Sequence, residues 1–258
     1  MSELETEDIA LRLSSIKKRY GGVVALDGVS MDFPRNSITA IVGDNGAGKS
    51  TTLKIISGAE YPDSGEIHVN GQQVRFRAPE DARQAGIETV YQDLALANNL
   101  TAAENLFMGR EEKWGVGGLA FLRQKKMQTM AEEIFESFSI NVPSVKVPVS
   151  GLSGGQRQGV AIARAVNWGS DVVLLDEPTA ALGVTETAKV EDVIIGLREK
   201  GLTQVIVSHN LDQVFRLSDR IAVMRRGKLM ANLETSRTDP QSVVALITGV
   251  TPQDQNGF

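Results

Sequence analysis

The stretch GDNGAGKS, residues 43–50, constrains the fold of this chain more than any other feature. It follows the apolar run ITAIV and precedes a segment with helical periodicity that extends from Lys49 to about Ser57. Glycines let a loop wrap closely around a ligand, and the helix that follows adds partial positive charge at its N-terminus. The pattern GxxxxGK[ST] in this strand–loop–helix context therefore predicts a phosphate loop that binds a nucleoside triphosphate.

Each part of the predicted loop has a task. Lys49 is expected to reach the β- and γ-phosphates, and the Ser50 hydroxyl to ligate Mg²⁺. The alternative is a flexible glycine turn, which the flanking strand and helix disfavour. The residues predicted to bind the nucleotide in this loop are Gly43, Asp44, Asn45, Gly46, Ala47, Gly48, Lys49, Ser50 and Thr51.

Two adjacent carboxylates end the apolar run VVLL, in the stretch DVVLLDEP. A buried strand that ends in unpaired negative charges is costly unless something compensates them. Asp176, at the carboxyl end of a predicted parallel strand, is expected to face the phosphate loop and bind Mg²⁺. Because side chains alternate along a strand, Glu177 is expected to point the other way and act as general base toward a water. The alternative for Glu177 is a surface acid that caps the next helix.

Strands and helices alternate over much of the chain. TETAKVEDVIIGLREKG and LDQVFRLSD read as helices, whereas TQVIVS reads as a buried strand. RIAVMRRGKLMANL and EIHVNGQQV read as hairpins, and LRLSSIKKRY and VVALDGVSMDF as further strands. This order predicts an α/β core with a parallel sheet covered on both faces. Residues 94–166 are expected to form a mainly helical insert, in which the apolar stripe of LRQKKMQTMAEEIFESF packs into a core.

Composition excludes several classes of site. Lys and Arg number 27 and Asp and Glu number 32, so the net charge of −5 gives no basic excess for nucleic acid. The chain has no cysteine, which excludes disulfides, thiolate metal sites and cysteine nucleophiles. The acidic start MSELETEDIA is unlike a secretory signal, and no apolar run approaches the ~20 residues of a membrane span.

The stretch LSGGQRQGVAIARAV, residues 152–166, places Ser-Gly-Gly before a helix and shortly before DVVLLDEP. Together with the phosphate loop, in this order, it resembles the signature of the ATP-binding cassette (ABC) family over almost the whole chain. The resemblance implies that Ser153, Gly154, Gly155 and Gln156 of one subunit cover the ATP held by another. ATP and Mg²⁺ are the implied cofactors, and ATP hydrolysis the implied activity.

Other positions match the family by context. Tyr20 in KKRYGG resembles the aromatic residue that stacks on adenine; a core tyrosine is the alternative. Gln92 in VYQD resembles the glutamine that contacts Mg²⁺ and moves with the helical insert. His209 in IVSHN resembles the switch histidine that contacts the γ-phosphate, although by itself it could equally be structural. His68 is expected to be structural or exposed.

The resemblance also implies an organisation. One nucleotide-binding domain is expected over residues 1–258, with 11–93 and 167–250 as the α/β core and an antiparallel β subdomain. Residues 94–166 form the helical subdomain, and 1–10 and 251–258 are expected to be mobile tails. A chain with one copy of each motif needs a second cassette, most simply itself, and transmembrane permease subunits. It is then expected at the cytoplasmic face of the membrane as a peripheral protein.

Two stretches, YQDLALANNLTAAENLFMGRE and DEPTAALGVTET, resemble importers of simple sugars, with fructose, ribose or xylose as candidate substrates. A separate periplasmic or extracellular binding protein would select the sugar. Gly183 stands where most cassettes carry an aspartate that reaches across the dimer, which puts cross-talk between the two sites in doubt. The candidate residues for docking the permease are Ala95, Leu96, Leu100, Phe107 and Met108, with burial in the insert as the alternative.

Three other functions compete with transport. An ABC ATPase of translation or DNA repair is disfavoured, because the chain has no second cassette, long coiled coil or basic patch. A metabolic kinase would leave the signature stretch without a role. A regulatory ATPase that docks on a membrane protein without transport stays open from sequence alone.

Overall fold

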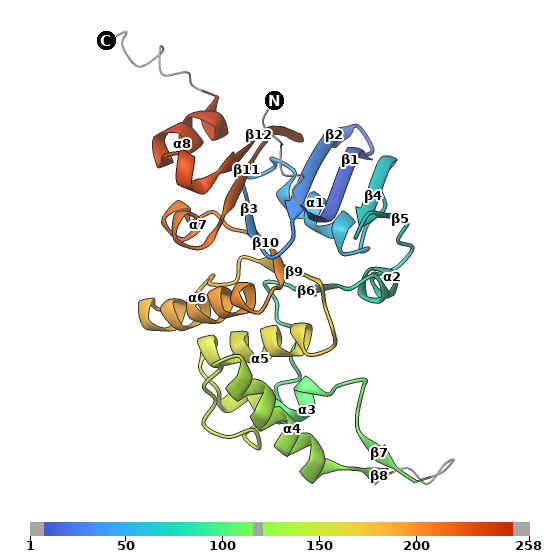
Figure 1. Cartoon of the computed structure of the whole chain (residues 1–258), viewed down its shortest axis with the longest axis vertical. Coiled ribbons are helices and arrows are strands. Elements are labelled where there is room, and N and C mark those ends of the chain that lie inside the picture. Colours follow the sequence, from blue (N-terminus) through green and yellow to red (C-terminus); the bar gives the residue numbers. More distant parts are fainter. Residues whose placement is uncertain (1–7, 116–120, 250–258) are drawn as a thin grey trace. The chain divides into compact units, whose positions relative to one another are not determined.

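The computed structural model describes residues 8–115 and 121–249. The chain divides into two compact units (Figure 1). Within the described ranges, the first unit combines residues 8–89, 170–177 and 198–249, and the second combines 90–115, 121–169 and 178–197. Of the expected tails, 1–10 and 251–258, residues 1–7 and 251–258 lie outside the described residues.

A six-stranded sheet with the strand order β12-β11-β3-β10-β9-β6 forms the centre of the first unit. Strands β3, β9, β10 and β11 run parallel, and β12 pairs antiparallel with β11. Every residue of β3 and β10 is buried, which explains why apolar residues stand at consecutive positions in both strands, at 40–42 and 205–207, rather than alternating with exposed polar ones. The bounds are β3 Ile38–Val42, β6 Ile87–Val90, β9 Val172–Asp176, β10 Thr203–Val207, β11 Arg220–Arg225 and β12 Lys228–Glu234.

A second sheet, with the order β2-β1-β4-β5, is antiparallel. Its strands are β1 Ile9–Tyr20, β2 Val23–Pro34, β4 Ser64–Val69 and β5 Gln72–Val74. Asn70 and Gly71, with φ of 50° and 77°, form the predicted turn between β4 and β5. Strand β1 begins within the segment expected to be a mobile tail, because Ala10 is fully buried in the core and holds the chain there.

Helices of the first unit are α1 Lys49–Ile56, α2 Pro79–Gln84, α7 Leu211–Leu217 and α8 Pro240–Thr248, with a 3-10 helix at Thr235–Arg237. Helix α8 was not predicted from the sequence, although Asp239 and Pro240 are a typical helix start. Asp239 accepts a hydrogen bond from the Ser242 backbone N–H at 2.9 Å and caps the helix. The helix buries Val243 in a cluster with Ile221 and Val223 of β11.

Helices dominate the second unit, as expected: α3 Ala102–Leu106, α4 Gln124–Ser137, α5 Gly154–Val166 and most of α6 Val184–Glu199, with a 3-10 helix at Val149–Gly151. Met127, Ala131 and Phe135 form the buried face of α4, so its apolar stripe packs into a core, as predicted. A short strand pair, β7 Lys113–Trp114 with β8 Phe121–Leu122, was not expected within this insert.

The parallel sheet, the antiparallel N-terminal sheet and the helical insert together match the predicted fold class. No helix in the described ranges is long and apolar enough to cross a membrane.

Candidate functional site

The predicted phosphate loop connects β3 to α1, and backbone conformation and close packing explain its glycines. Gly43, Gly46 and Gly48 have φ of 152°, 79° and 106°, values that disfavour side chains. A Cβ at Gly43 would lie 2.2 Å from the Met224 backbone oxygen, and one at Gly48 would lie 2.7 Å from Leu26 Cδ2. The loop is therefore held against neighbouring strands and is not a flexible turn.

Helix α1 begins directly after this loop, and no side chain caps its N-terminus. Gly48 occupies the N-cap position, and the first turn holds no acidic residue. Backbone N–H groups at an uncapped helix start carry partial positive charge and lack acceptors within the helix. The loop and helix start together therefore have the features of an anion-binding site.

The Lys49 side chain is almost fully buried, with 9% of the residue exposed. Its Nζ donates to the carbonyl oxygens of Gly43 at 2.7 Å and Asp44 at 3.0 Å. Burial lowers the pKa of Lys49, while the nearby carboxylates of Glu177, Asp44 and Asp176 act in the opposite direction. An ammonium has three N–H donors, so these carbonyls hold the group in the loop and leave a donor for an anion.

Asp176 is the last residue of β9 and lies at the edge of the sheet where β3 leads into the loop. Burial, followed by the charge of Glu177, raises the pKa of its carboxyl group, while Lys49 lowers it. A half-buried carboxylate is poorly hydrated, so a cation bound at this position would stabilise its negative charge.

Glu177 lies beyond the end of β9, so the expected alternation along a strand does not orient it. Its φ is 50°, in the left-handed region, and its N–H donates to the Val207 carbonyl oxygen at 2.9 Å. This turn, rather than the pleat, separates the Glu177 side chain from that of Asp176. A non-glycine residue in this conformation is strained, and such strain is common at functional sites.

His209 meets Glu177 across two strand ends. His209 Nδ1 lies 2.8 Å from Glu177 Oε1, and 76% of the His209 side chain is exposed against 18% of the Glu177 side chain. The histidine lies between β10 and α7, on a turn where the Asn210 N–H donates to the Ser208 hydroxyl. An exposed imidazole on a strand end does not fill the core, which disfavours a structural role for His209.

Tyr20, Ser50 and Thr51 are further predicted site residues of the first unit, as are the exposed Asn45 and the buried Ala47. Tyr20 is 42% exposed, with Lys18 Nζ at 5.3 Å from its ring centroid, so it is not a core tyrosine. Ser50 is exposed and Thr51 half-buried at the start of α1. An exposed ring next to a cation leaves a face open for stacking.

Gln92 and the signature residues belong to the second unit. Gln92 is exposed and lines a cavity of about 340 Å³ together with Gly154, Arg157 and Ala180. The predicted contact of Gln92 with Mg²⁺ stays a prediction.

Ser153 caps α5. Its hydroxyl accepts a hydrogen bond from the Gln156 backbone N–H at 3.4 Å, and its own N–H donates to Gln156 Oε1 at 2.9 Å. Gly154 and Gly155 begin the helix between them. This reciprocal cap orients the serine at the start of the helix. Glu186, which the sequence reading did not single out, lies against these two glycines.

The expected docking residues divide into two groups. Phe107 is fully buried and packs edge-to-face on Trp168 at a centroid distance of 5.8 Å, so its selection as a docking residue was wrong. Met108 is 41% exposed, Ala95 is exposed, and Leu96 and Leu100 are partly exposed. Core packing holds the phenylalanine, whereas the other four remain accessible.

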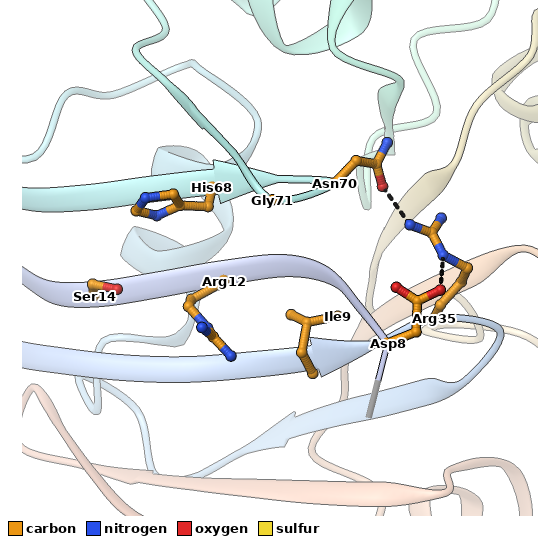
Figure 2. A pocket seen from close by; sticks show the side chains of 8 residues that line it. All are labelled: Asp8, Ile9, Arg12, Ser14, Arg35, His68, Asn70 and Gly71. Atoms are coloured by element: carbon orange, nitrogen blue, oxygen red, sulfur yellow. Dashed lines mark hydrogen bonds and ion pairs between the residues drawn. The ribbon is translucent and has the colours of Figure 1, made fainter. Parts of the chain in front are cut away.

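A separate cavity of about 660 Å³ lies on the antiparallel sheet of the first unit and shares no residue with the phosphate loop (Figure 2). Arg35 bonds Asp8 and Asn70 at its end, and Arg12 bonds Asp32 through two nitrogens. His68 lines this cavity, and its Nδ1 is buried without a hydrogen-bond partner. Because both guanidinium groups are already paired, the cavity offers no excess of positive charge.

Comparisons with known proteins found one matching family and several similar sequences. The family model for the ABC transporter matches residues 26–180. The fructose import ATP-binding protein FrcA of Rhizobium meliloti is 46% identical over 243 residues, covering 93% of this chain and 94% of that protein. The xylose/arabinose import ATP-binding protein XylG of Sulfolobus acidocaldarius is 43% identical, covering 92% of this chain and 93% of that protein. The ribose import ATP-binding protein RbsA 3 of Rubrobacter xylanophilus is 40% identical over 93% of this chain, which spans 47% of that protein.

Solved structures show the same fold. The ADP conformation of MJ1267, an ATP-binding cassette of an ABC transporter, aligns with a TM-score of 0.77 at 26% identity, covering 96% of this chain and 97% of that one. The dimeric structure of MJ0796, a bacterial ABC transporter cassette, aligns with a TM-score of 0.72 at 26% identity, covering 87% of this chain and 98% of that one. The predicted fold class and family resemblance are thereby confirmed, and this chain belongs to the ABC transporter family as an ATP-binding cassette.

Proposed function

We propose that this cassette hydrolyses ATP through Glu177 and His209, and that hydrolysis drives the import of a simple sugar. The contact of 2.8 Å between Glu177 Oε1 and His209 Nδ1 carries the proposal. It places a carboxylate and an imidazole at one edge of the sheet, where β3 also leads into the phosphate loop with the buried Lys49.

The residues of the first unit fit a Mg–triphosphate. The uncapped start of α1 and the Lys49 ammonium would hold the phosphates, with Gly43 to Thr51 as the wall of the site. The Ser50 hydroxyl and the Asp176 carboxylate would hold Mg²⁺. When bound, Mg²⁺ neutralises charge on the phosphate oxygens during transfer. Tyr20 would stack on the adenine ring.

Glu177 would take a proton from the water that attacks the γ-phosphate. His209 would orient that carboxylate through its Nδ1 contact and, on its exposed side, reach the γ-phosphate. The left-handed turn at Glu177 fixes the base beyond the strand end, so it does not compete with Asp176 for the cation. Adjacent acids thereby take separate tasks.

Relatives support the substrate class and the partners. The relatives' names specify import of fructose, xylose or arabinose, and ribose. A dimeric cassette of a bacterial ABC transporter supports pairing with a second cassette, most simply another copy of this chain. Ser153, Gly154, Gly155 and Gln156 would then cover the ATP of the partner cassette. Permease subunits and an external sugar-binding protein would complete the importer, with this chain at the cytoplasmic face of the membrane. A regulatory ATPase on another membrane protein is the alternative.

Permease docking would use the accessible residues Leu96, Leu100 and Met108 of the second unit. The boundaries proposed for the helical subdomain, 94–166, include these positions. A charge at Leu100 should reduce sugar uptake while leaving ATP hydrolysis by the free cassette unchanged. Unchanged uptake would contradict this contact.

The proposed activity is tested with Glu177→Gln. The variant should bind ATP with wild-type affinity but hydrolyse it at least about 100-fold more slowly, because the general base is lost. Glu133→Gln, at an exposed position on α4, is the matched control and should retain full activity. Hydrolysis at the wild-type rate in Glu177→Gln would remove this residue from the mechanism. Reconstitution with the permease and binding protein, followed by a screen for sugars that stimulate hydrolysis, would identify the substrate.

A further inference from the structure

Glu186 lies directly on the glycines that begin helix α5. A Cβ at Gly155 would lie 3.1 Å from Glu186 Cβ and 3.5 Å from its Cα. A Cβ at Gly154 would lie 3.4 Å from Glu186 Oε2 and 2.7 Å from Leu182 Cδ2. The glycines therefore let the first turn of α6 approach the backbone of α5, with a carboxylate at the helix start.

This carboxylate is in an environment that favours its charge. A hydrogen bond from the Ser153 side chain, followed by one from the Gly155 backbone N–H, lowers the pKa of Glu186, and Arg157 adds to the effect. The first turn of α5 has no acidic residue of its own. Glu186 thus provides the anion that a helix N-terminus attracts.

We propose that Glu186 occupies, in the free cassette, the anion site that receives the γ-phosphate of the partner's ATP, so that closure of two cassettes must displace it. The inference rests on the proposed function, in which Ser153 and the two glycines cover ATP bound to a second copy. Both anions would use the same Ser153 and Gly155 donors.

Displacement is feasible because Glu186 is only partly buried on the first turn of α6. A flexible side chain can swing into water, and the arriving phosphate takes over the favourable interaction with the helix start. Displacing Glu186 raises the ATP concentration that closure requires, because only the fraction of cassettes whose anion site is open can receive the partner's ATP. Glu186 thereby sets a threshold of ATP below which two cassettes stay apart.

The test uses Glu186→Gln and Glu186→Ala in the Glu177→Gln background, which holds ATP without turnover. Light scattering during a titration with Mg-ATP measures the ATP concentration that gives half-maximal dimer. This concentration should fall about 2–10-fold, more for alanine than for glutamine, because the neutral amide still accepts hydrogen bonds. Glu133→Gln, which removes a charge from α4, should leave it unchanged.

Further measurements separate a threshold from a structural role. Binding of a fluorescent ATP analogue to dilute, monomeric protein should be the same with and without the Glu186 substitutions. With Glu177 restored, Glu186→Gln should lower KM for ATP and leave kcat unchanged. An unchanged or higher ATP requirement for dimer formation, with or without a lower melting temperature, would overturn the inference. If Glu177→Gln alone neither bound ATP nor dimerised, the proposed function itself would fail.

Discussion

Gly43→Ala and Gly46→Ala form a matched pair in the phosphate loop that separates backbone conformation from close packing. Both glycines have positive φ, 152° and 79°, so alanine at either position costs about 1–2 kcal/mol of conformational strain. At Gly46 the new Cβ meets nothing within 4 Å. At Gly43 it would lie 2.2 Å from the Met224 carbonyl oxygen and 3.0 Å from Ala47 Cβ.

The Met224 backbone cannot move away easily, because the residue is fully buried in β11, which pairs with β3. Overpacking of this kind adds about 1–3 kcal/mol. We therefore expect Gly46→Ala to lower the free energy of unfolding by about 1–2 kcal/mol and Gly43→Ala to lower it by about 2–5 kcal/mol. Urea denaturation followed by far-ultraviolet circular dichroism measures both values on the same protein preparation.

Nucleotide binding gives a second readout. Gly43→Ala should also weaken ATP binding, because the Gly43 carbonyl oxygen holds Lys49 Nζ at 2.7 Å and must move with the backbone. Equal destabilisation by the two substitutions would refute the reasoning, since it would show that the loop adapts around Gly43 without loss.

Other predictions test the second unit. Phe107→Ala should cost about 3–5 kcal/mol of stability in urea denaturation, because the ring is fully buried against Trp168; a cost below 1 kcal/mol would restore Phe107 as a surface residue. Gly183→Asp should fold normally, since a Cβ there meets nothing within 4 Å; an unchanged Hill slope for ATP would show that the absent carboxylate is unimportant. Hydrogen bonds from the Thr101 backbone N–H and hydroxyl hold the pKa of Glu104 below its usual value. The contribution of Glu104 to stability is then complete above its unfolded pKa of about 4.3 and is lost as pH falls through its folded pKa. The difference in free energy of unfolding between the wild type and Glu104→Gln should therefore shrink in acid, and a difference that does not change with pH would contradict this.

Much of the fold was predictable because its signals are local. Both faces of β3 and β10 are buried, and this burial leaves three consecutive apolar residues in each strand, at 40–42 and 205–207. The phosphate loop was predictable for a similar reason, because three of its glycines have backbone angles that other residues disfavour. Short segments with weak periodicity, such as β7 and β8, leave no such pattern.

The candidate site was predictable in its members but not in its geometry. Asp176 and Glu177 could be selected as neighbours in the sequence, yet their separation depends on a left-handed turn that follows the strand end. From the sequence, His209 could be either a site residue or a structural one. The structure decides between them, because the pairing of β9 with β10 places its imidazole next to the Glu177 carboxylate.

The sequence by itself determined the phosphate loop and most of the order of strands and helices, because glycine conformation and apolar runs are properties of adjacent residues. It determined the family through the resemblance of its motifs. Only the tertiary structure decided that Phe107 is buried, that Glu177 contacts His209 and that Glu186 lies on Gly154 and Gly155. Each of these facts depends on which faces meet when distant segments pack, and neither composition nor periodicity within one segment records that choice.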